Sequence, residues 1–301
     1  MKLRPAPFRL TLGIMLVTMI VTSSQRVAAG EYIYADGFEP AVDCSAVLAC
    51  PIPAAGKSCI SGQLTSAGSG APLRAFIKAQ QACGDGAIGG PCDLKLTLYD
   101  ALDFASNPGG STPLTSVEKL IDGCGRFRIN GITPPAFGTV AIVADDADPA
   151  LESDLHAPAA TLHVLGTNER VDHVNVVAAR NDTVDLWTES AGSPFGASSF
   201  VDVGTVLLQF SVGATPRTGV TVTLNASVAA SKDYYFSDTA PTGRVHIDAA
   251  LTATGADGAA LLADGGLLSY SGTGGEPLGC TWPLVTAASI PGVLVFVPIG
   301  C

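Results

Sequence analysis

The chain has 301 residues and an acidic balance, with 16 basic against 27 acidic side chains and a formal net charge of −11. A nucleic-acid-binding protein needs a basic surface to neutralise phosphates. The charge therefore excludes that class, and polyanions should be repelled. Residues 1–29 hold four of the basic side chains and no acidic one, so the remainder carries 12 basic against 27 acidic and a net charge of −15.

The N-terminal segment has the pattern of an export signal. A basic start precedes an apolar run of 13 residues, Leu10–Thr22, and Val27-Ala28-Ala29 then offers small side chains for cleavage. The run is shorter than the roughly 20 residues of a membrane span, and no second run of spanning length follows. We expect cleavage of residues 1–29, no membrane span afterwards, and a secreted or cell-surface location, with the periplasm as the alternative.

The cysteines predict a disulfide framework, because eight cysteines in an exported chain can form up to four disulfides. All eight lie beyond residue 29: Cys44, Cys50, Cys59, Cys83, Cys92, Cys124, Cys280 and Cys301. No Cys-x-x-Cys occurs, so the usual spacing of zinc ribbons and thioredoxin-like sites is missing. Pairing of Cys83 with Cys92 would close a Gly-rich loop, and we expect Cys280 to pair with Cys301. The other four cysteines allow three pairings.

Short runs rich in Val, Ile, Thr, Phe and Leu recur along the chain between turn signals, which is typical of an all-β sandwich. Asp-Gly pairs, which suit turns that need positive φ, punctuate these runs. Residues 30–57 are a leader segment. Residues 58–146 form a first module, with strands predicted at Cys59–Leu64, Leu73–Ala79, Leu94–Tyr99, Val117–Ile121, Arg126–Ile129 and Thr139–Ala144.

Residues 147–200 are predicted to be a mixed connector. It holds two strands, Thr161–Leu165 and His173–Ala178, and a short helix near Asp182–Glu189 with a polar N-cap. Residues 201–301 form a second sandwich, with strands predicted at Val206–Val212, Val220–Ala226, Tyr234–Phe236, Arg244–Ile247, Ala259–Leu262, Leu267–Tyr270 and Val293–Val297. The predicted fold is all-β, with two disulfide-stabilised β-sandwich domains joined by this connector.

Three segments of the first module follow one another in a recognisable order. They are Cys59-Ile-Ser-Gly-Gln-Leu, Gly70-Ala-Pro-Leu-Arg-Ala and Asp122-Gly-Cys-Gly-Arg-Phe-Arg-Ile. In this order they resemble the carboxypeptidase regulatory-like domain. The resemblance implies a transthyretin-like β-sandwich that serves as an accessory module rather than a catalytic one. The insert Gln80–Pro91 and the extra cysteines depart from the family.

Two segments of the second module, Gly219-Val-Thr-Val-Thr-Leu and Gly255-Ala-Asp-Gly-Ala-Ala-Leu-Leu, look like a bacterial Ig-like domain. That resemblance implies a stalk or spacer. The segment Ile33-Tyr-Ala-Asp-Gly-Phe-Glu is similar to a leader of exported bacterial proteins. Together these likenesses indicate a bacterial secreted protein, and none of them implies a reaction.

An acidic cluster follows the last predicted strand of the first module. Asp145, Asp146 and Asp148 are its first members, and Glu152 and Asp154 follow. Hard oxygen ligands in a loop can hold Ca²⁺ outside the cell, although the EF-hand pattern fails here. The alternative is a solvated acidic loop. Calcium is the one cofactor that the sequence suggests.

Catalytic signatures do not occur in the chain, which has neither a G-x-S-x-G elbow nor an H-E-x-x-H helix. His163 and His173 lie on predicted strands and could share a metal with His156 or Asp172. The alternative is that all four are ordinary surface or cross-strand residues.

The aromatic side chains raise the question of sugar binding, because a flat aromatic surface can stack on a carbohydrate. The alternative is that they anchor the core. The candidates are Trp187, Trp282, Tyr234, Tyr235 and Phe236.

These observations predict a protein that is not an enzyme and that has a structural, adhesion or display role. Its partner would be a cell-surface protein or a glycan. The first alternative is a carbohydrate-binding module. The second is an unrecognised hydrolase, which would need a deep polar cleft with two close carboxylates or a histidine beside an acid.

Overall fold

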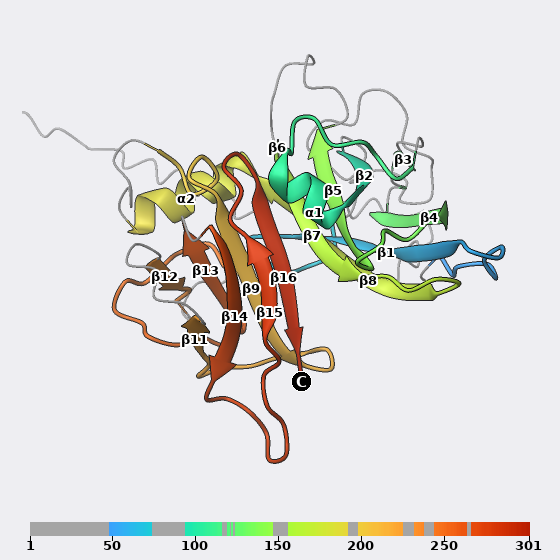
Figure 1. Ribbon diagram of the computed structural model, residues 1–301. Helices are drawn as coiled ribbons and strands as arrows, with labels where there is room; N and C mark the ends of the chain where they lie inside the picture. Colours follow the sequence, from blue (N-terminus) through green and yellow to red (C-terminus); the bar gives the residue numbers. More distant parts are fainter. Residues whose placement is uncertain are drawn as a thin grey trace, which may run out of the picture. The chain divides into compact units, whose positions relative to one another are not determined.

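The computed structural model describes residues 48–73, 94–115, 119–120, 122, 124–146, 156–191, 198–224, 232–237, 244–263 and 266–301. All of them belong to one compact unit, Tyr32–Cys301. This part of the chain holds sixteen strands and two helices, which confirms the predicted all-β class (Figure 1). The expected signal segment, most of the leader and most of the predicted strand Leu73–Ala79 lie outside the described residues.

The elements of the first half are β1 (Ser58–Ser66), β2 (Leu94–Asp100), α1 (Ala101–Ser106), β3 (Lys119–Leu120), β4 (Arg126–Ile132) and β5 (Thr139–Asp146). Next come β6 (His156–Ala157), β7 (Ala159–Val164), β8 (Arg170–Arg180) and α2 (Asn181–Ala191). The second half holds β9 (Thr205–Val212), β10 (Thr215–Pro216), β11 (Thr221–Leu224), β12 (Lys232–Tyr235), β13 (Ala259–Ala263), β14 (Leu267–Thr273), β15 (Val285–Ala288) and β16 (Leu294–Gly300).

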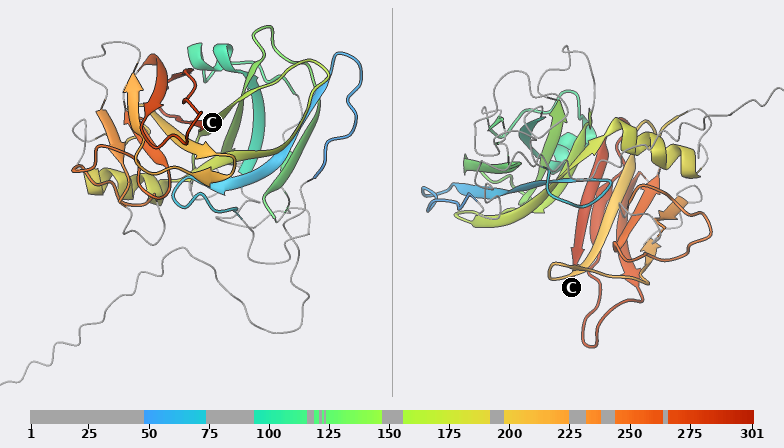
Figure 2. Two further views of the ribbon diagram at one scale, coloured as in Figure 1. Left: turned by 90° about the horizontal axis from the view of Figure 1, so that it is seen from below. Right: turned by 180° about the vertical axis from the view of Figure 1, so that it is seen from behind.

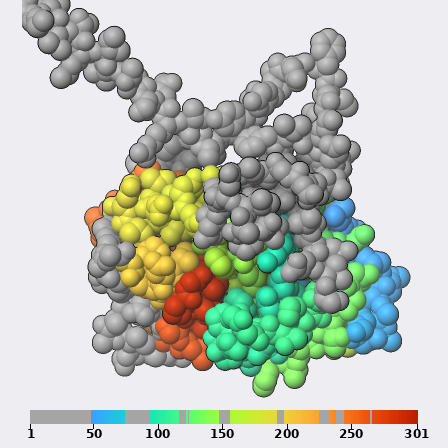
Figure 3. All heavy atoms as spheres, turned by 90° about the horizontal axis from the view of Figure 1, so that it is seen from above, coloured from blue at the N-terminus to red at the C-terminus, as the bar shows by residue number. Residues whose placement is uncertain are grey.

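Most predicted strands coincide with observed ones, and the predicted helix is α2. The strand predicted at Arg244–Ile247 is wrong, because only an isolated bridge between Phe236 and Ile247 forms there. Helix α1 was not predicted. It begins where the Asp100 carboxylate accepts a hydrogen bond from the Leu102 amide, and its residue Phe104 packs inward against Tyr99. The rest of α1 is largely exposed. The region that contains α1 is the teal surface in Figure 3.

One mixed sheet of nine strands runs through both halves. Its order is β12-β13-β9-β16-β7-β5-β2-β3, with β10 beside β9. Strand β16 lies between β7 and β9 and pairs with both of them in parallel. The expected division into two separate sandwiches is therefore not confirmed. The hydrophobic pattern locates strands, but it does not say which distant strand each one will pair with.

A second sheet, β4-β1-β8-β6, packs on the first-half strands of the nine-stranded sheet. Residues 147–200, expected to be a connector, supply β6 and β8 to this second sheet and β7 to the large one. Buried aliphatic and aromatic side chains such as Leu64, Leu96 and Phe127 fill the space between the two sheets.

The second half has a core on each face of the large sheet. On one face, β9 and β16 pack against the three-stranded sheet β11-β14-β15. On the other face they pack against α2, the yellow helix in Figure 2, and against the segment around Phe200. Strand β16 contributes to both cores, because successive side chains point to opposite faces. Leu294 and Phe296 enter one core, and Val295 and Val297 enter the other. A strand with both faces covered reads as a continuous apolar run, as this one does.

Neither described helix is long and apolar enough to cross a membrane.

Candidate functional site: the bulged strands around Cys59

Strand β1 has an irregular neighbour on its parallel side. Asp172 and His173 of β8 together lie opposite Ser61 alone, so β8 bulges at this point. His173 has φ 66°, a left-handed conformation that residues other than glycine rarely adopt. Conformations of this kind are common at functional sites. The bulge is therefore a candidate functional site.

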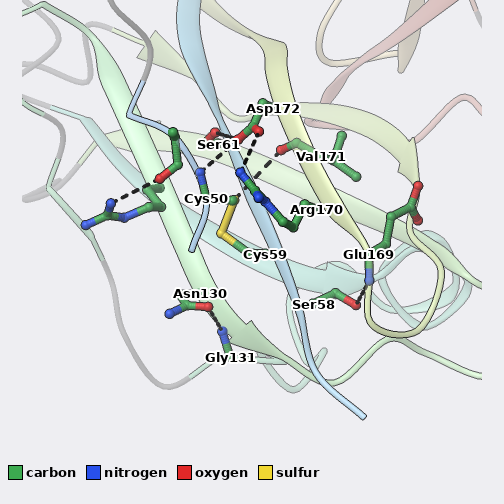
Figure 4. The surroundings of a disulfide bond; sticks show 12 residues. Cys50, Ser58, Cys59, Ser61, Asn130, Gly131, Glu169, Arg170, Val171 and Asp172 are labelled. Atoms are coloured by element: carbon green, nitrogen blue, oxygen red, sulfur yellow. Dashed lines mark hydrogen bonds and ion pairs between the residues drawn. A yellow bond between two sulfur atoms is a disulfide. The ribbon is translucent and has the colours of Figure 1, made fainter. Parts of the chain in front are cut away.

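A second bulge lies on the antiparallel side of β1. Asn130 and Gly131 of β4 together lie opposite Cys59 alone, and Gly131 has φ 74°. β-Bulges redirect side chains and often lie beside functional sites. Two of them flank β1 at Cys59 and Ser61, which puts the irregular backbone and its polar side chains in one small region (Figure 4).

Strands β1 and β8 approach unusually closely just after the bulge. A Cβ atom on Gly62 would lie 1.8 Å from the carbonyl oxygen of Val174, which is backbone and cannot swing aside. The position therefore requires glycine.

The Asp172 carboxylate organises this region. Its Oδ1 accepts hydrogen bonds from the Cys50 amide at 2.9 Å and from the Ser61 hydroxyl at 2.6 Å. Its Oδ2 lies 3.7 Å from Nη2 of Arg170. Figure 4 shows these groups converging on Asp172 from β1, from β8 and from the segment before β1. The carboxylate thus connects the segment around Cys50 to the bulge on β8.

These contacts lower the pKa of Asp172. The largest cause is the hydrogen bond from Ser61, followed by the one from the Cys50 amide, while partial burial acts in the opposite direction. The positive charges of Arg170 and His173 lower the pKa further. The carboxylate therefore stays ionised over a wider acid range than a free aspartate.

Cys50, whose amide binds the Asp172 carboxylate, also forms a disulfide. Cys50 is bonded to Cys59, with Cα atoms 5.8 Å apart and both residues buried. It is one of the pairings that the sequence left open. The expected bond between Cys280 and Cys301 is confirmed, with Cα atoms 6.0 Å apart.

Cys124 is also disulfide-bonded, so none of the described cysteines is free. Cys44 and the expected pairing of Cys83 with Cys92 lie outside the described residues.

The trio Ser61, Asp172 and His173 does not have the geometry of a catalytic triad. In a triad the histidine lies between the serine and the acid, takes the hydroxyl proton and is held by the carboxylate. Here the hydroxyl of Ser61 donates directly to Asp172, Ser61 is fully buried, and His173 is exposed. What these groups do is hold backbone in place.

At the end of β5, Asp146, one of the three expected calcium ligands, forms a buried pair with His156. Nδ1 of His156 lies 2.8 Å from Oδ1 of Asp146, and the His156 amide donates to Oδ2 at 3.2 Å. Both side chains are almost fully buried. Adjacent strand residues point to opposite faces, so Asp145 does not converge with Asp146. Asp148 lies outside the described residues.

The histidines likewise stay apart. His156 is engaged with Asp146, whereas His173 is exposed on the bulge. His163 is half-buried on β7, and burial lowers its pKa while the charge of Glu169 opposes that shift. Within the described ranges, no three His, Cys, Asp or Glu side chains lie close enough to hold a metal.

The aromatic candidates belong to the core, so the idea that they form a sugar platform is wrong. Trp187 is fully buried and donates its Nε1 hydrogen to the carbonyl of Arg244. Trp282 is 5% exposed and donates Nε1 to the carbonyl of Gly274 at 2.9 Å. Buried tryptophans normally find such a partner. The remaining candidates are buried or partly buried: Tyr234, Tyr235 and Phe236.

A buried ion pair that the sequence did not suggest lies within the second half, and the backbone of its arginine also contacts the first half. Nε of Arg244 lies 3.4 Å from Oδ2 of Asp257, and the Arg244 amide donates to the carbonyl of Gly68 at 2.8 Å. Burial lowers the pKa of Arg244, and Asp257 partly offsets that effect. No motif marks this ion pair. None marks the Asp172 network either, because Cys50 and Ser61 lie more than a hundred residues from Asp172.

No family model and no curated protein sequence matches the chain. Among solved structures, the shaft pilin SpaA from Lactobacillus rhamnosus GG is similar with a TM-score of 0.23 and 9% identity, over 81% of this chain and 97% of that one. The Bacillus anthracis TIE protein reaches a TM-score of 0.23 and 10% identity, over 81% of this chain and 34% of that one.

A third structure is CBMbc (family CBM26) from Eubacterium rectale Amy13K in complex with maltoheptaose. It has a TM-score of 0.22 and 9% identity, over 81% of this chain and 93% of that one. At such low TM-scores these likenesses carry no argument about function.

Proposed function

We propose that this protein is a non-catalytic, exported structural protein with a role in adhesion, display or spacing at the cell surface. The observation that carries the proposal is that every described cysteine is disulfide-bonded. Disulfides persist in oxidising compartments outside the cytosol. Cross-links on a β-structure suit a protein that must keep its shape in an exposed setting.

The use of the polar side chains supports a structural role. Asp172 holds the Cys50 amide and the Ser61 hydroxyl, and Asp146 holds His156. These two carboxylates, the hydroxyl and the imidazole, which are acid, base or nucleophile types, are thus committed to internal hydrogen bonds. The acidic net charge adds solubility in an exposed location.

We further propose that residues 58–146 form a carboxypeptidase regulatory-like sandwich, which β6, β7 and β8 complete. Its support is the pair of sheets that enclose one apolar core in the first half of the chain. We propose an Ig-like sandwich for residues 201–301 on similar grounds, because β9, β13 and β16 face the three-stranded sheet across a second core.

A combined screen on purified residues 30–301 tests the role. The protein is incubated with a panel of glycosidase, esterase and peptidase substrates, and in parallel it is applied to a glycan array and to intact bacterial cells, with and without added calcium. We expect no turnover and retention on cells. Hydrolysis that a single point substitution abolishes would overturn the proposal.

A glycan-array signal would instead favour the carbohydrate-binding alternative. An exposed aromatic side chain would then have to carry it, and Phe137, which is 75% exposed, is the described candidate. Phe137→Ala should remove such a signal. Tyr270→Phe is the matched control, because Tyr270 is fully buried.

A further inference from the structure

The bulge on β4 brings together the two residues of the chain's single Asn-Gly pair. Asn130 and Gly131 are both exposed at the edge of the second sheet. The amide of Gly131 donates a hydrogen bond to Oδ1 of Asn130 at 2.9 Å, as the dashed line in Figure 4 marks. The backbone nitrogen therefore lies beside the side-chain carboxamide carbon of the preceding residue.

We propose that Asn130 is a site of spontaneous deamidation through Gly131. The Gly131 nitrogen loses its proton and bonds to Cγ of Asn130, the Cγ–Nδ2 bond breaks, and ammonia leaves. The product is a five-membered cyclic imide. Water then adds to one of the two imide carbonyls and opens the ring, which gives aspartate or isoaspartate. The only co-reactant is solvent water.

Three features of the site favour this reaction. Glycine has no Cβ to hinder the approach of its nitrogen, and its backbone is the most permissive of all residues. The space around Gly131 is open, because a Cβ placed there would meet no atom within 4 Å. The bulge also leaves Asn130 and Gly131 without a one-to-one partner on β1, so the pair can move without first breaking regular strand pairing.

The two products should differ in their effect on the fold. Aspartate adds a negative charge on the same face of β4 as Arg128, which lies two residues earlier and can partly compensate it. Isoaspartate adds an atom to the backbone. It would displace the buried pairing of Ile132 with Ser58, which directly follows the bulge.

The experiment ages the disulfide-intact protein in mildly alkaline buffer and follows all six asparagines by peptide mapping and mass spectrometry. We expect conversion of Asn130 to be at least roughly tenfold faster than that of Asn175, which equals about 1.4 kcal/mol in activation free energy. Asn175 is an exposed residue on β8 that precedes valine. Asn107 precedes proline, which has no amide to attack, and it should not react.

Two variants and an unfolded sample complete the test. Asn130→Gln should stop the reaction, and Asn130→Asp should fold normally and reproduce the charge of the aspartate product. The same time course in urea shows whether the sequence alone or the folded bulge determines the rate. The proposal fails if Asn130 stays amidated in the folded protein, or reacts no faster than Asn175 there, while it converts readily in urea.

Discussion

Parallel strand pairing occurs in two places in the described part of this mainly antiparallel protein. The first seam joins β1 to β8, and the second seam joins β16 to both β7 and β9. The first seam is interrupted by a bulge, and polar contacts to Asp172 surround it. The second seam runs without a register shift, and apolar side chains cover β16 on both faces.

The difference shows two ways of stabilising a parallel pair. In the second seam, burial of aliphatic side chains supplies the free energy, roughly 1.5–3 kcal/mol for each fully buried one. In the first seam the regular strand pairing is interrupted at the bulge. The Cys50–Cys59 disulfide and the hydrogen bonds to Asp172 stabilise that region instead. Damage to the second seam should therefore affect the whole unit, and damage to the first should act locally.

The largest expected effect comes from a charge in the second seam. Val295→Asp places a carboxylate at a position that is 1% exposed, so the unfolding free energy should fall by about 4 kcal/mol or more. Chemical denaturation followed by circular dichroism and tryptophan fluorescence measures it. Val164→Asp is the matched control, because Val164 is 70% exposed on the neighbouring β7. Equal losses in both variants would contradict the buried seam.

Removal of each disulfide compares the cross-link at the first seam with the one at the C-terminal end of β16. Chain-entropy arithmetic for the 21-residue separation of Cys280 and Cys301 gives about 3.3 kcal/mol, and the 9-residue separation of Cys50 and Cys59 gives about 2.6 kcal/mol. We expect the paired Cys→Ser substitution at Cys280 and Cys301 to cost slightly more. Thermal unfolding under non-reducing conditions measures both. A reversed order would mean that the native contacts around Cys50, rather than loop closure, dominate.

A smaller effect should follow Gly62→Ala. The added methyl group would collide with the Val174 carbonyl, so β8 must shift, at roughly 1–3 kcal/mol for overpacking. Hydrogen exchange should show the loss of protection confined to β1 and β8. Gly109→Ala is the control on a turn, because Gly109 has no positive φ and open space around its Cβ. A global loss of protection in Gly62→Ala would contradict the expectation that damage to the first seam acts locally.

The smallest effect is the pH dependence that Asp172 contributes. Its pKa is lower in the folded protein than in the unfolded chain. Its stabilisation is therefore fully present above the unfolded pKa and is lost as the pH falls through the folded pKa. Asp172→Asn should flatten the decline in stability between roughly pH 5 and pH 2, because the amide cannot titrate.

Urea midpoints across that pH range give the measurement for Asp172. Asp182→Asn is the control, since its carboxylate is exposed in a surface pair with Arg180, and such pairs contribute little. Parallel curves for wild type and Asp172→Asn would show that the network does not couple to stability.

Much of the local structure could be predicted, and little of the site. The alternating run Leu94-Lys-Leu-Thr-Leu-Tyr gave β2, and the apolar run Val293–Val297 gave β16. The Asp172 network escaped prediction because Cys50 and Ser61 lie more than a hundred residues from Asp172. The suggestion of a sugar-binding aromatic surface failed for a related reason. A composition that suits a sugar platform equally suits a core, and only burial separates the two.

The sequence by itself determined that this is an all-β protein with a Cys280–Cys301 bond, because side-chain periodicity and short cysteine spacing are local properties. Only the tertiary structure decided that β16 enters between β7 and β9, so that one sheet joins both halves. It also decided that two bulges flank Cys59. Parallel pairing joins segments that are distant along the chain, and its register depends on long-range packing that no local pattern encodes.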